Sequence, residues 1–296
     1  MRKYSGPVFP QPINCLDDLN TAMKWLVDLP PIPSAMEHGA PCSIGETVEA
    51  ALGLPPSTRR IDLELEDASV EIKSDRISAT TPKSEATSTL KSPDGPHFSG
   101  PSDSDRYRQF VEKYGWKSDG SGIATLSTGE KRKHRKGKNY YNRINLYHAV
   151  KPEPHKITDL YVEFDEEEDR IWVCHPKEGR ILYYDQTNID EIMDKYNFQY
   201  CPHAMPLTIE GTPHFDFQSV DALVTKLYPF TVRRFWEAIV SGEQDLEFRA
   251  HICDDIYCVN AASRQCKPPG GLRCRGTAFR TPKKRIQTVW NIEKIA

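Results

Sequence analysis

The residues best suited to chemistry lie in a short hairpin predicted at residues 61–73. Asp62 and Glu64 alternate with apolar residues on its first strand, and Glu71 and Lys73 form a Glu-x-Lys pair on its second strand. If the turn brings the strands together, Glu64 lies roughly opposite Glu71, and the four charged side chains share one face. Metal-dependent nucleases use such a set, because carboxylates hold Mg²⁺ while the Lys ammonium orients the nucleophile. A solvated strand face is the alternative interpretation.

One further glutamate can join this set. Glu49 lies on the flank of a helix predicted just before the hairpin, from which it could reach the same metal ion. A solvated helix surface is the alternative, because glutamate side chains are mostly exposed.

Two groups of basic residues suit nucleic acid. The run at 130–143 holds six Lys or Arg between 131 and 138, followed by Tyr140 and Tyr141, a combination that favours binding to a phosphate backbone. A solvated loop is the alternative for this run.

A second basic group lies near the C-terminus. Arg273, Arg275 and Arg280 flank the segment G-T-A-F. Guanidinium forks fit the edge of guanine, so a cluster of these arginines near Arg249 would suit reading of the major groove. Phosphate contact and plain solvation remain open as alternatives.

The cysteines allow a metal site of another kind. Cys253, Cys258, Cys266 and Cys274 fall within 22 residues, but their spacing lacks the C-x₂-C pairs of zinc ribbons and fingers. A zinc site and buried thiols both remain open, and Cys201-Pro-His203 could contribute to the former.

The elements that must position these residues follow from hydrophobic periodicity. The chain of 296 residues favours one large domain or two coupled domains. Because helices and strands come in mixed order, we expect the α/β class (α+β, with a mixed sheet). The spacing predicts helices at 16–27, 44–52, 107–114, 189–196, 220–227 and 232–239, and strands at 60–65, 70–73, 160–164, 170–174, 180–184 and 246–252.

Composition excludes several classes of protein. A net charge of −3 excludes a chain that is basic throughout, although local basic surfaces remain possible. No apolar run approaches the length of a membrane span, and the first residues lack the apolar core of a signal peptide. We therefore expect a cytoplasmic protein without membrane contact, in which the eight cysteines are thiols or metal ligands.

The order of these motifs resembles the MvaI/BcnI family of type II restriction endonucleases, which is similar to the mismatch-repair nicking enzyme MutH. The resemblance rests on I-G-E-T-V-E (44–49), V-E-I-K-S (70–74), T-L-K-S-P (89–93), R-Y-R-Q-F-V-E-K-Y-G-W (106–116) and G-T-A-F-R (276–280), in that order. It implies a restriction-endonuclease-like PD-(D/E)xK core with a DNA-recognition lobe.

The resemblance carries catalytic roles onto particular residues. The helix glutamate of the family falls on Glu49, and its Glu-x-Lys pair falls on Glu71 and Lys73. Its first metal-binding residue, an Asp usually preceded by Pro, aligns without gaps to Glu64, with Asp62 two residues earlier. Asp67 becomes the candidate only if the hairpin is shortened, so the metal ligands are Glu71 with one of these acids.

Roles in DNA recognition also follow from the resemblance. The D-x-R of the family matches Glu247 and Arg249, and its final arginine matches Arg280. Where the family usually shows H-x-H, this chain has Arg273 and Arg275, which favours guanine edges or phosphates.

The resulting prediction is a Mg²⁺-dependent type II endonuclease that binds double-stranded DNA at a short, G·C-rich, near-palindromic site. We expect a monomer that nicks one strand at a time, with a cognate DNA methyltransferase in the same host. We expect residues 1–130 to form the catalytic lobe and residues 131–296 to form the DNA-recognition lobe. The alternative is that C-terminal segments return to the catalytic lobe. A MutH-like repair nickase and a non-catalytic DNA-binding protein are the alternatives.

Overall fold

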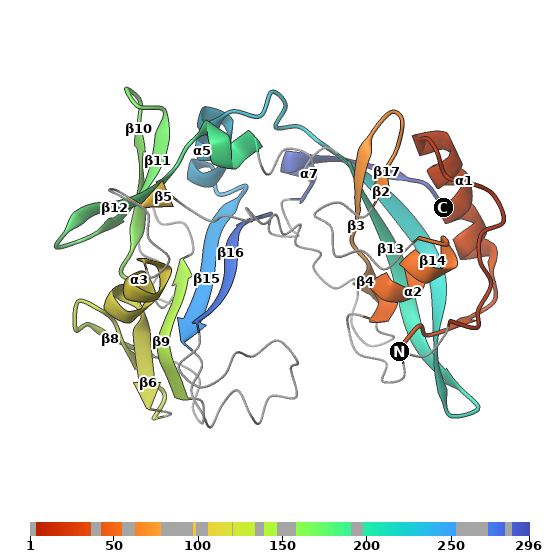
Figure 1. Ribbon diagram of the computed structural model, residues 1–296, viewed down its shortest axis with the longest axis horizontal. Helices are drawn as coiled ribbons and strands as arrows, with labels where there is room; N and C mark the ends of the chain where they lie inside the picture. The colour runs from red at the N-terminus through yellow and green to blue at the C-terminus, as the bar shows by residue number, and fades with distance from the viewer. Residues whose placement is uncertain are drawn as a thin grey trace. The chain divides into compact units, whose positions relative to one another are not determined.

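The chain folds into two compact units. The computed structural model describes residues 4–36, 43–54, 63–77, 97–98, 106–119, 121–133, 139–146, 158–190, 198–252, 272–281 and 286–296. Unit 1 combines Met1–Ser88, Met193–Tyr228 and Pro282–Ala296, and unit 2 combines Thr89–Ile192 with Pro229–Thr281 (Figure 1). The predicted α/β class with a mixed sheet is confirmed. The division into a catalytic lobe 1–130 and a recognition lobe 131–296 concerns function and stays a prediction.

Unit 1 is built on a seven-stranded sheet in the order β1-β14-β13-β3-β2, with β17 beside β14 and β4 beside β13. Strand β13 runs parallel to β3 and β4, and the other pairs are antiparallel. Its elements are α1 (Leu16–Asp28), β1 (Ile32–Pro33), α2 (Ser43–Ala51), β2 (Leu63–Glu64), β3 (Ser69–Ile72), β4 (Asp75–Arg76), β13 (Phe198–Ile209), β14 (Thr212–Thr225), α7 (Ile286–Val289) and β17 (Trp290–Lys294).

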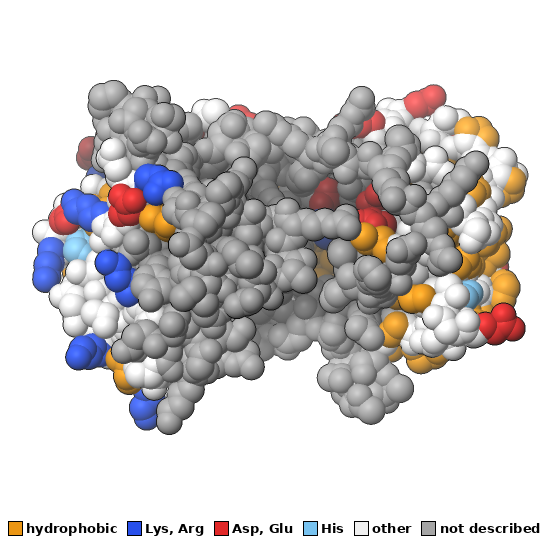
Figure 2. All heavy atoms as spheres, turned by 60° about the horizontal axis from the view of Figure 1, so that its bottom comes forward, with side chains coloured by type: hydrophobic (Ala, Val, Ile, Leu, Met, Phe, Trp, Pro, Cys, Tyr) orange, Lys and Arg blue, Asp and Glu red, His pale blue; other side chains and the backbone are white. Residues whose placement is uncertain are grey.

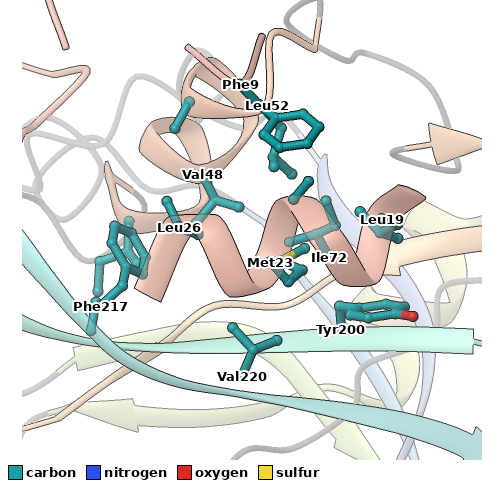
Figure 3. Close-up of a cluster of buried hydrophobic side chains, with 14 of the residues drawn as sticks. Phe9, Leu19, Met23, Leu26, Val48, Leu52, Ile72, Tyr200, Phe217 and Val220 are labelled. Carbon is teal, nitrogen blue, oxygen red and sulfur yellow. The ribbon is translucent and has the colours of Figure 1, made fainter. Parts of the chain in front are cut away.

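Helices α1 and α2 contribute to a common core with one face of this sheet. The apolar side chains of α1 recur at helical spacing, so that Leu19, Met23 and Leu26 are all buried. They pack in one cluster with Tyr200 and Val220 from the strands, as Figure 3 shows. Because side chains alternate along a strand, the residues between these apolar positions emerge on the other face of the sheet.

Unit 2 contains two further sheets. One is four-stranded, in the order β10-β11-β12-β5, and the other is six-stranded, in the order β16-β15-β9-β6-β7-β8. The elements are β5 (His97–Phe98), α3 (Arg106–Tyr114), β6 (Trp116–Asp119), β7 (Ile123–Thr125), β8 (Lys131–Lys133), β9 (Asn139–Leu146), β10 (Tyr161–Asp165), β11 (Arg170–His175), β12 (Gly179–Tyr184), α5 (Val232–Val240), β15 (Asp245–Ile252) and β16 (Leu272–Arg280).

Most predicted elements are confirmed, and one is wrong. Helices α1, α2, α3 and α5, the meander β10–β11–β12 and strand β15 lie where periodicity predicts them. The segment predicted as a helix at 220–227 is instead the end of strand β14, between β13 and β17. Val220, Ala222 and Leu223 are all buried, so apolar residues occupy both faces of this strand and imitate helical spacing. The predicted helix 189–196 lies largely outside the described residues.

Two smaller findings complete the fold. The N-cap residue of helix α1 is Cys15. The Asp18 carboxylate accepts hydrogen bonds from the backbone N–H of Cys15 at 3.3 Å and from that of Asn14 at 3.0 Å. In the part of the chain that the structure describes, no helix is long and apolar enough to cross a membrane.

Candidate active site

Glu71 and Lys73 form a charged pair at the end of strand β3. Val70 and Ile72 point into the core of unit 1, so Glu71 between them projects from the opposite face of the sheet. Its side chain is 7% exposed, while that of Lys73 is 38% exposed. The Lys73 Nζ donates a hydrogen bond to the Glu71 Oε1. The backbone N–H of Lys73 donates to the Tyr200 carbonyl at 2.8 Å, which fixes the strand beside β13.

The upstream acid of the hairpin is placed differently from the prediction. Glu64 pairs with Ser69, not with Glu71, and the Ser69 Oγ donates to the Glu64 Oε2 at 2.8 Å. The Glu64 side chain is exposed. The tight turn sets this register, because the Leu65 N–H donates to the Ala68 carbonyl at 2.8 Å. Asp62 lies outside the described residues.

Asp67, the third candidate acid, binds the start of helix α1. Its Oδ1 and Oδ2 accept from the backbone N–H of Leu16 at 3.1 Å and 3.3 Å. A carboxylate is favourable there, because the first N–H groups of a helix lack intrahelical partners and carry partial positive charge. This contact ties the hairpin turn to α1 and gives Asp67 a structural role.

Glu49 lies on helix α2, one turn after Gly45 on the same side. A Cβ atom placed on Gly45 would lie 3.5 Å from the Ser74 Oγ, so this side of α2 meets the chain immediately after Lys73. Helix α2 ends at Ala51, and Gly53, two residues later, has a φ of 73°, a conformation that favours glycine. The sequence thus brings the helix that carries Glu49 close to the strand that carries Lys73.

Strand β13 adds polar residues that sequence analysis did not assign to catalysis. Gln199 is the register partner of Glu71 and is 2% exposed. Four residues on, His203 lies level with Asp75 of β4, and its Nε2 is 3.0 Å from the Asp221 Oδ2 of β14. The alternation of Gln199, Cys201 and His203 in the sequence predicts that they share one face of a strand. It does not predict which strand pairs with that strand.

The donor set on this face suits a hard cation. Among the described residues, no three His, Cys, Asp or Glu side chains form a group that could hold a metal. Mg²⁺ does not require such a group, because it keeps several waters and is often bound through one or two carboxylates. The buried Glu71 carboxylate, beside the exposed end of a sheet strand, is a fitting ligand of that kind.

The predicted recognition residues fall on the paired strands β15 and β16. Glu247 pairs with Ala278, and the register shifts between Phe248 and Ala250, next to Arg249. Arg273 pairs with His251, and Arg280 pairs with Asp245. Arg275 falls within the irregular part of the ladder. The backbone therefore brings both segments side by side, while the side chains of these residues lie outside the described part of the structure.

The basic run is partly built into the same sheet. Lys131 and Lys133 of β8 are exposed, whereas Arg132 donates to the Thr158 carbonyl at 2.6 Å and to the Glu130 carboxylate at 2.9 Å. Other exposed cations of unit 2 include Lys113, Lys117, Lys177, Arg180 and Arg233, and Figure 2 shows such side chains on one face of the molecule. Residues 134–138 lie outside the described part.

The zinc site that the cysteine cluster allows stays a prediction. Cys253, Cys258 and Cys266 lie outside the described residues, and only the backbone of Cys274 is described, within β16. Cys201 is buried and forms no disulfide, as the alternative interpretation predicts for it.

Comparison with known proteins identifies the fold. Neither a family model nor a curated protein matches this chain. Among solved structures, restriction endonuclease MvaI in complex with its cognate DNA substrate is similar over 95% of this chain and 98% of its own, with 16% identity and a TM-score of 0.59. MvaI in the absence of DNA is similar over 97% and 100%, with 16% identity and a TM-score of 0.45. The chain therefore has the fold of restriction endonuclease MvaI, which confirms the resemblance seen in its sequence motifs.

Proposed function

We propose that this protein is a Mg²⁺-dependent, site-specific endonuclease that hydrolyses phosphodiester bonds of double-stranded DNA. The observation that carries the proposal is the buried Glu71 with Lys73 at its side, on a strand of a fold shared with MvaI. A buried carboxylate on a rigid strand is costly unless it has partners, so such groups are concentrated at functional sites.

Glu71 and Asp62 are the proposed metal ligands. An antiparallel ladder pairs residues whose numbers have a constant sum, and Leu63 pairs with Val70. The position that this register assigns to the partner of Glu71 is therefore 62 rather than 64. Glu64, which binds Ser69, is a supporting acid at most, and Asp67 binds α1. When bound, Mg²⁺ supplies positive charge beside the phosphate and stabilises the negative charge of the transition state.

The side chains around the metal position the reacting groups. The Lys73 ammonium, held by Glu71, orients the attacking water and keeps positive charge close to the phosphate. Glu49, on the side of α2 that meets Ser74, receives a proton or orients a second water. Since Val70 and Ile72 are buried, the strand holds Glu71 in a fixed position during the reaction.

Strands β15 and β16 are the proposed recognition surface. Two paired strands carry the proposed residues, Glu247 and Arg249 on β15 and Arg273, Arg275 and Arg280 on β16. Such residues can read base edges or bind phosphates. Arginines favour guanine, so the proposed target is G·C-rich. The proposed enzyme acts as a monomer in the cytoplasm, cuts strands one at a time, and is accompanied by a methyltransferase that protects the host DNA.

The test is incubation of supercoiled plasmid with the purified protein, in Mg²⁺ or in EDTA. The expected result is a nicked intermediate followed by discrete fragments, only with Mg²⁺. Lys73→Ala should abolish cleavage while leaving DNA binding largely intact. Lys24→Ala is the matched control, because Lys24 is exposed on α1.

The other outcomes decide between the alternatives. Nicking that stops at open circles, or that requires a partner protein, would favour a MutH-like nickase. Sequence-selective binding without scission in any metal would favour a DNA-binding protein. Full activity of Lys73→Ala would refute the assigned site.

A further inference from the structure

The pair formed by His203 and Asp221 lies on the face of the sheet that carries Glu71. Glu71 pairs with Gln199, and Asp75 pairs with His203, with the same register offset in this parallel arrangement. Positions 71, 75, 199 and 203 therefore share one face, which is turned away from the buried core cluster. Tyr200 and Ile72, which pair with each other, belong to the core on the other face.

The His203–Asp221 pair is partly buried, and its two side chains are in direct contact. The His203 side chain is 13% exposed and that of Asp221 is 31% exposed, and the 3.0 Å contact joins the His203 Nε2 to the Asp221 Oδ2. A carboxylate on one ring nitrogen fixes the orientation of an imidazole. On β17, Lys294 is the register partner of Asp221, and on β14 Ser219 is the partner of His203. Both positions belong to the same face.

The distance along the strands suits a neighbouring phosphate. His203 lies level with residue 75, two residues beyond Lys73, which corresponds to about 7 Å along a strand. The adjacent strand adds about 4.8 Å across the sheet. A step of this size is of the order of the separation between successive phosphates of one DNA strand. A backbone that presents one phosphate to Glu71 and Lys73 can present the next to His203.

We propose that His203, oriented by Asp221, binds the DNA phosphate next to the one that is cut. This inference rests on the proposed function and extends the same site. The contact requires the protonated imidazole, because with Nε2 on the Asp221 carboxylate the other nitrogen donates only when it carries a proton. Asp221 contacts the ring, and Lys294 is the register partner of Asp221 on β17. On the other side of β13, Asp75 is the backbone register partner of His203, two residues beyond Lys73.

The experiment compares wild-type protein with His203→Ala, His203→Gln and His203→Lys. Binding of a cleavable duplex is measured over a range of salt, without divalent metal, and cleavage kinetics are measured with Mg²⁺. His203→Ala should raise KM by about tenfold or more with little change in kcat, because a hydrogen bond to a charged group is lost. Its plot of log K against log salt should be shallower by about 0.9, the value for one phosphate contact.

Two further readouts separate phosphate binding from a structural role. His203→Lys should keep, at every pH, the salt slope that wild type shows at low pH, because the lysine ammonium stays charged. The advantage of wild type over His203→Gln should shrink as rising pH removes the second proton from the imidazole ring. Asp221→Asn should raise KM as well, by less than His203→Ala, since the ring is still present but less well oriented.

The outcomes are distinct. If wild type cuts DNA and His203→Ala has the same KM and salt slope, the inference is wrong while the proposed function stands. If all His203 variants lose thermal stability but the salt slope stays unchanged, His203 has only a structural role and the inference is again wrong. If wild type neither binds nor cuts DNA, the proposed function itself fails.

Discussion

A buried carboxylate in unit 2 gives a quantitative test of how the six-stranded sheet is held. Asp159 accepts hydrogen bonds from the Ser127 Oγ at 2.6 Å and from the Thr128 backbone N–H at 2.9 Å. Its side chain is 5% exposed, and the ring of His175 approaches it at 3.9 Å through Nε2. These bonds fasten the turn between β7 and β8 to the segment that precedes β10.

Replacing Asp159 by Ala removes the Oδ2 atom that accepts both hydrogen bonds and leaves two donors in a largely buried place. Each such loss costs about 1–3 kcal/mol, so the expected destabilisation for the two donors is about 2–6 kcal/mol. For a unit of this size, each kcal/mol lowers Tm by about 2–4 °C. Differential scanning calorimetry should therefore show a fall in Tm of about 4–24 °C for the transition of unit 2.

Two further variants control this result. Asp159→Asn keeps one oxygen at the same place and should recover a large part of the loss, because the amide oxygen still accepts. Asp190→Ala removes an exposed carboxylate that accepts a hydrogen bond from the Gln186 side chain at 2.8 Å. Because this bond lies at the surface, its loss should change stability by about 0.5 kcal/mol or less. A Tm of Asp159→Ala within about 2 °C of wild type would refute the reasoning, because the two donors would then have found other partners.

Two other predictions concern unit 1. Asp62→Asn should lower the rate of DNA cleavage by about a hundredfold or more, since a metal ligand supports several kcal/mol of transition-state stabilisation. Glu64→Gln should stay within a few-fold of wild type in the same plasmid assay. Equal losses in both variants would contradict the register argument. Burial raises the pKa of Tyr200 from 10.0 to about 12, so its contribution to stability is complete below pH 10 and is lost as pH rises toward 12. Tyr200→Phe also loses the 2.6 Å hydrogen bond to Asn20, so it should be less stable than wild type near neutral pH. In urea unfolding, its free energy of unfolding should fall less than that of wild type as pH rises. An equal fall in both proteins would argue against this assignment.

The elements that sequence analysis predicts well are those with one apolar face. Helix α1 shows Leu19, Met23 and Leu26 at helical spacing because only one side of it meets the sheet. Strand β14 does not follow this rule, since Leu223 and Val220 are buried on opposite faces and the period of two disappears. Burial on both faces is a property of the assembled sheet, and a local pattern does not contain it.

The candidate site divides in the same way. Glu71 and Lys73 are predictable because the chemistry of the pair depends on residues two apart on one strand. The role of Asp67 at the start of α1 and the contact of His203 with Asp221 depend on pairing between distant segments. The register of the hairpin depends on a turn in which Leu65 meets Ala68, and an error of two residues there exchanges Glu64 for another acid.

The charged pair also shows why V-E-I-K carries more information than Glu-x-Lys alone. Val70 and Ile72 anchor β3 in the core, so Glu71 must lie on the opposite face, at the register position beside Gln199. A charged residue at that position is desolvated by the sheet itself, so it must have a partner, and Lys73 supplies one. Apolar neighbours on a central strand therefore turn a common surface motif into a rigid, partly buried site, which is the condition that hydrolysis of a phosphodiester requires of the residues that bind the metal.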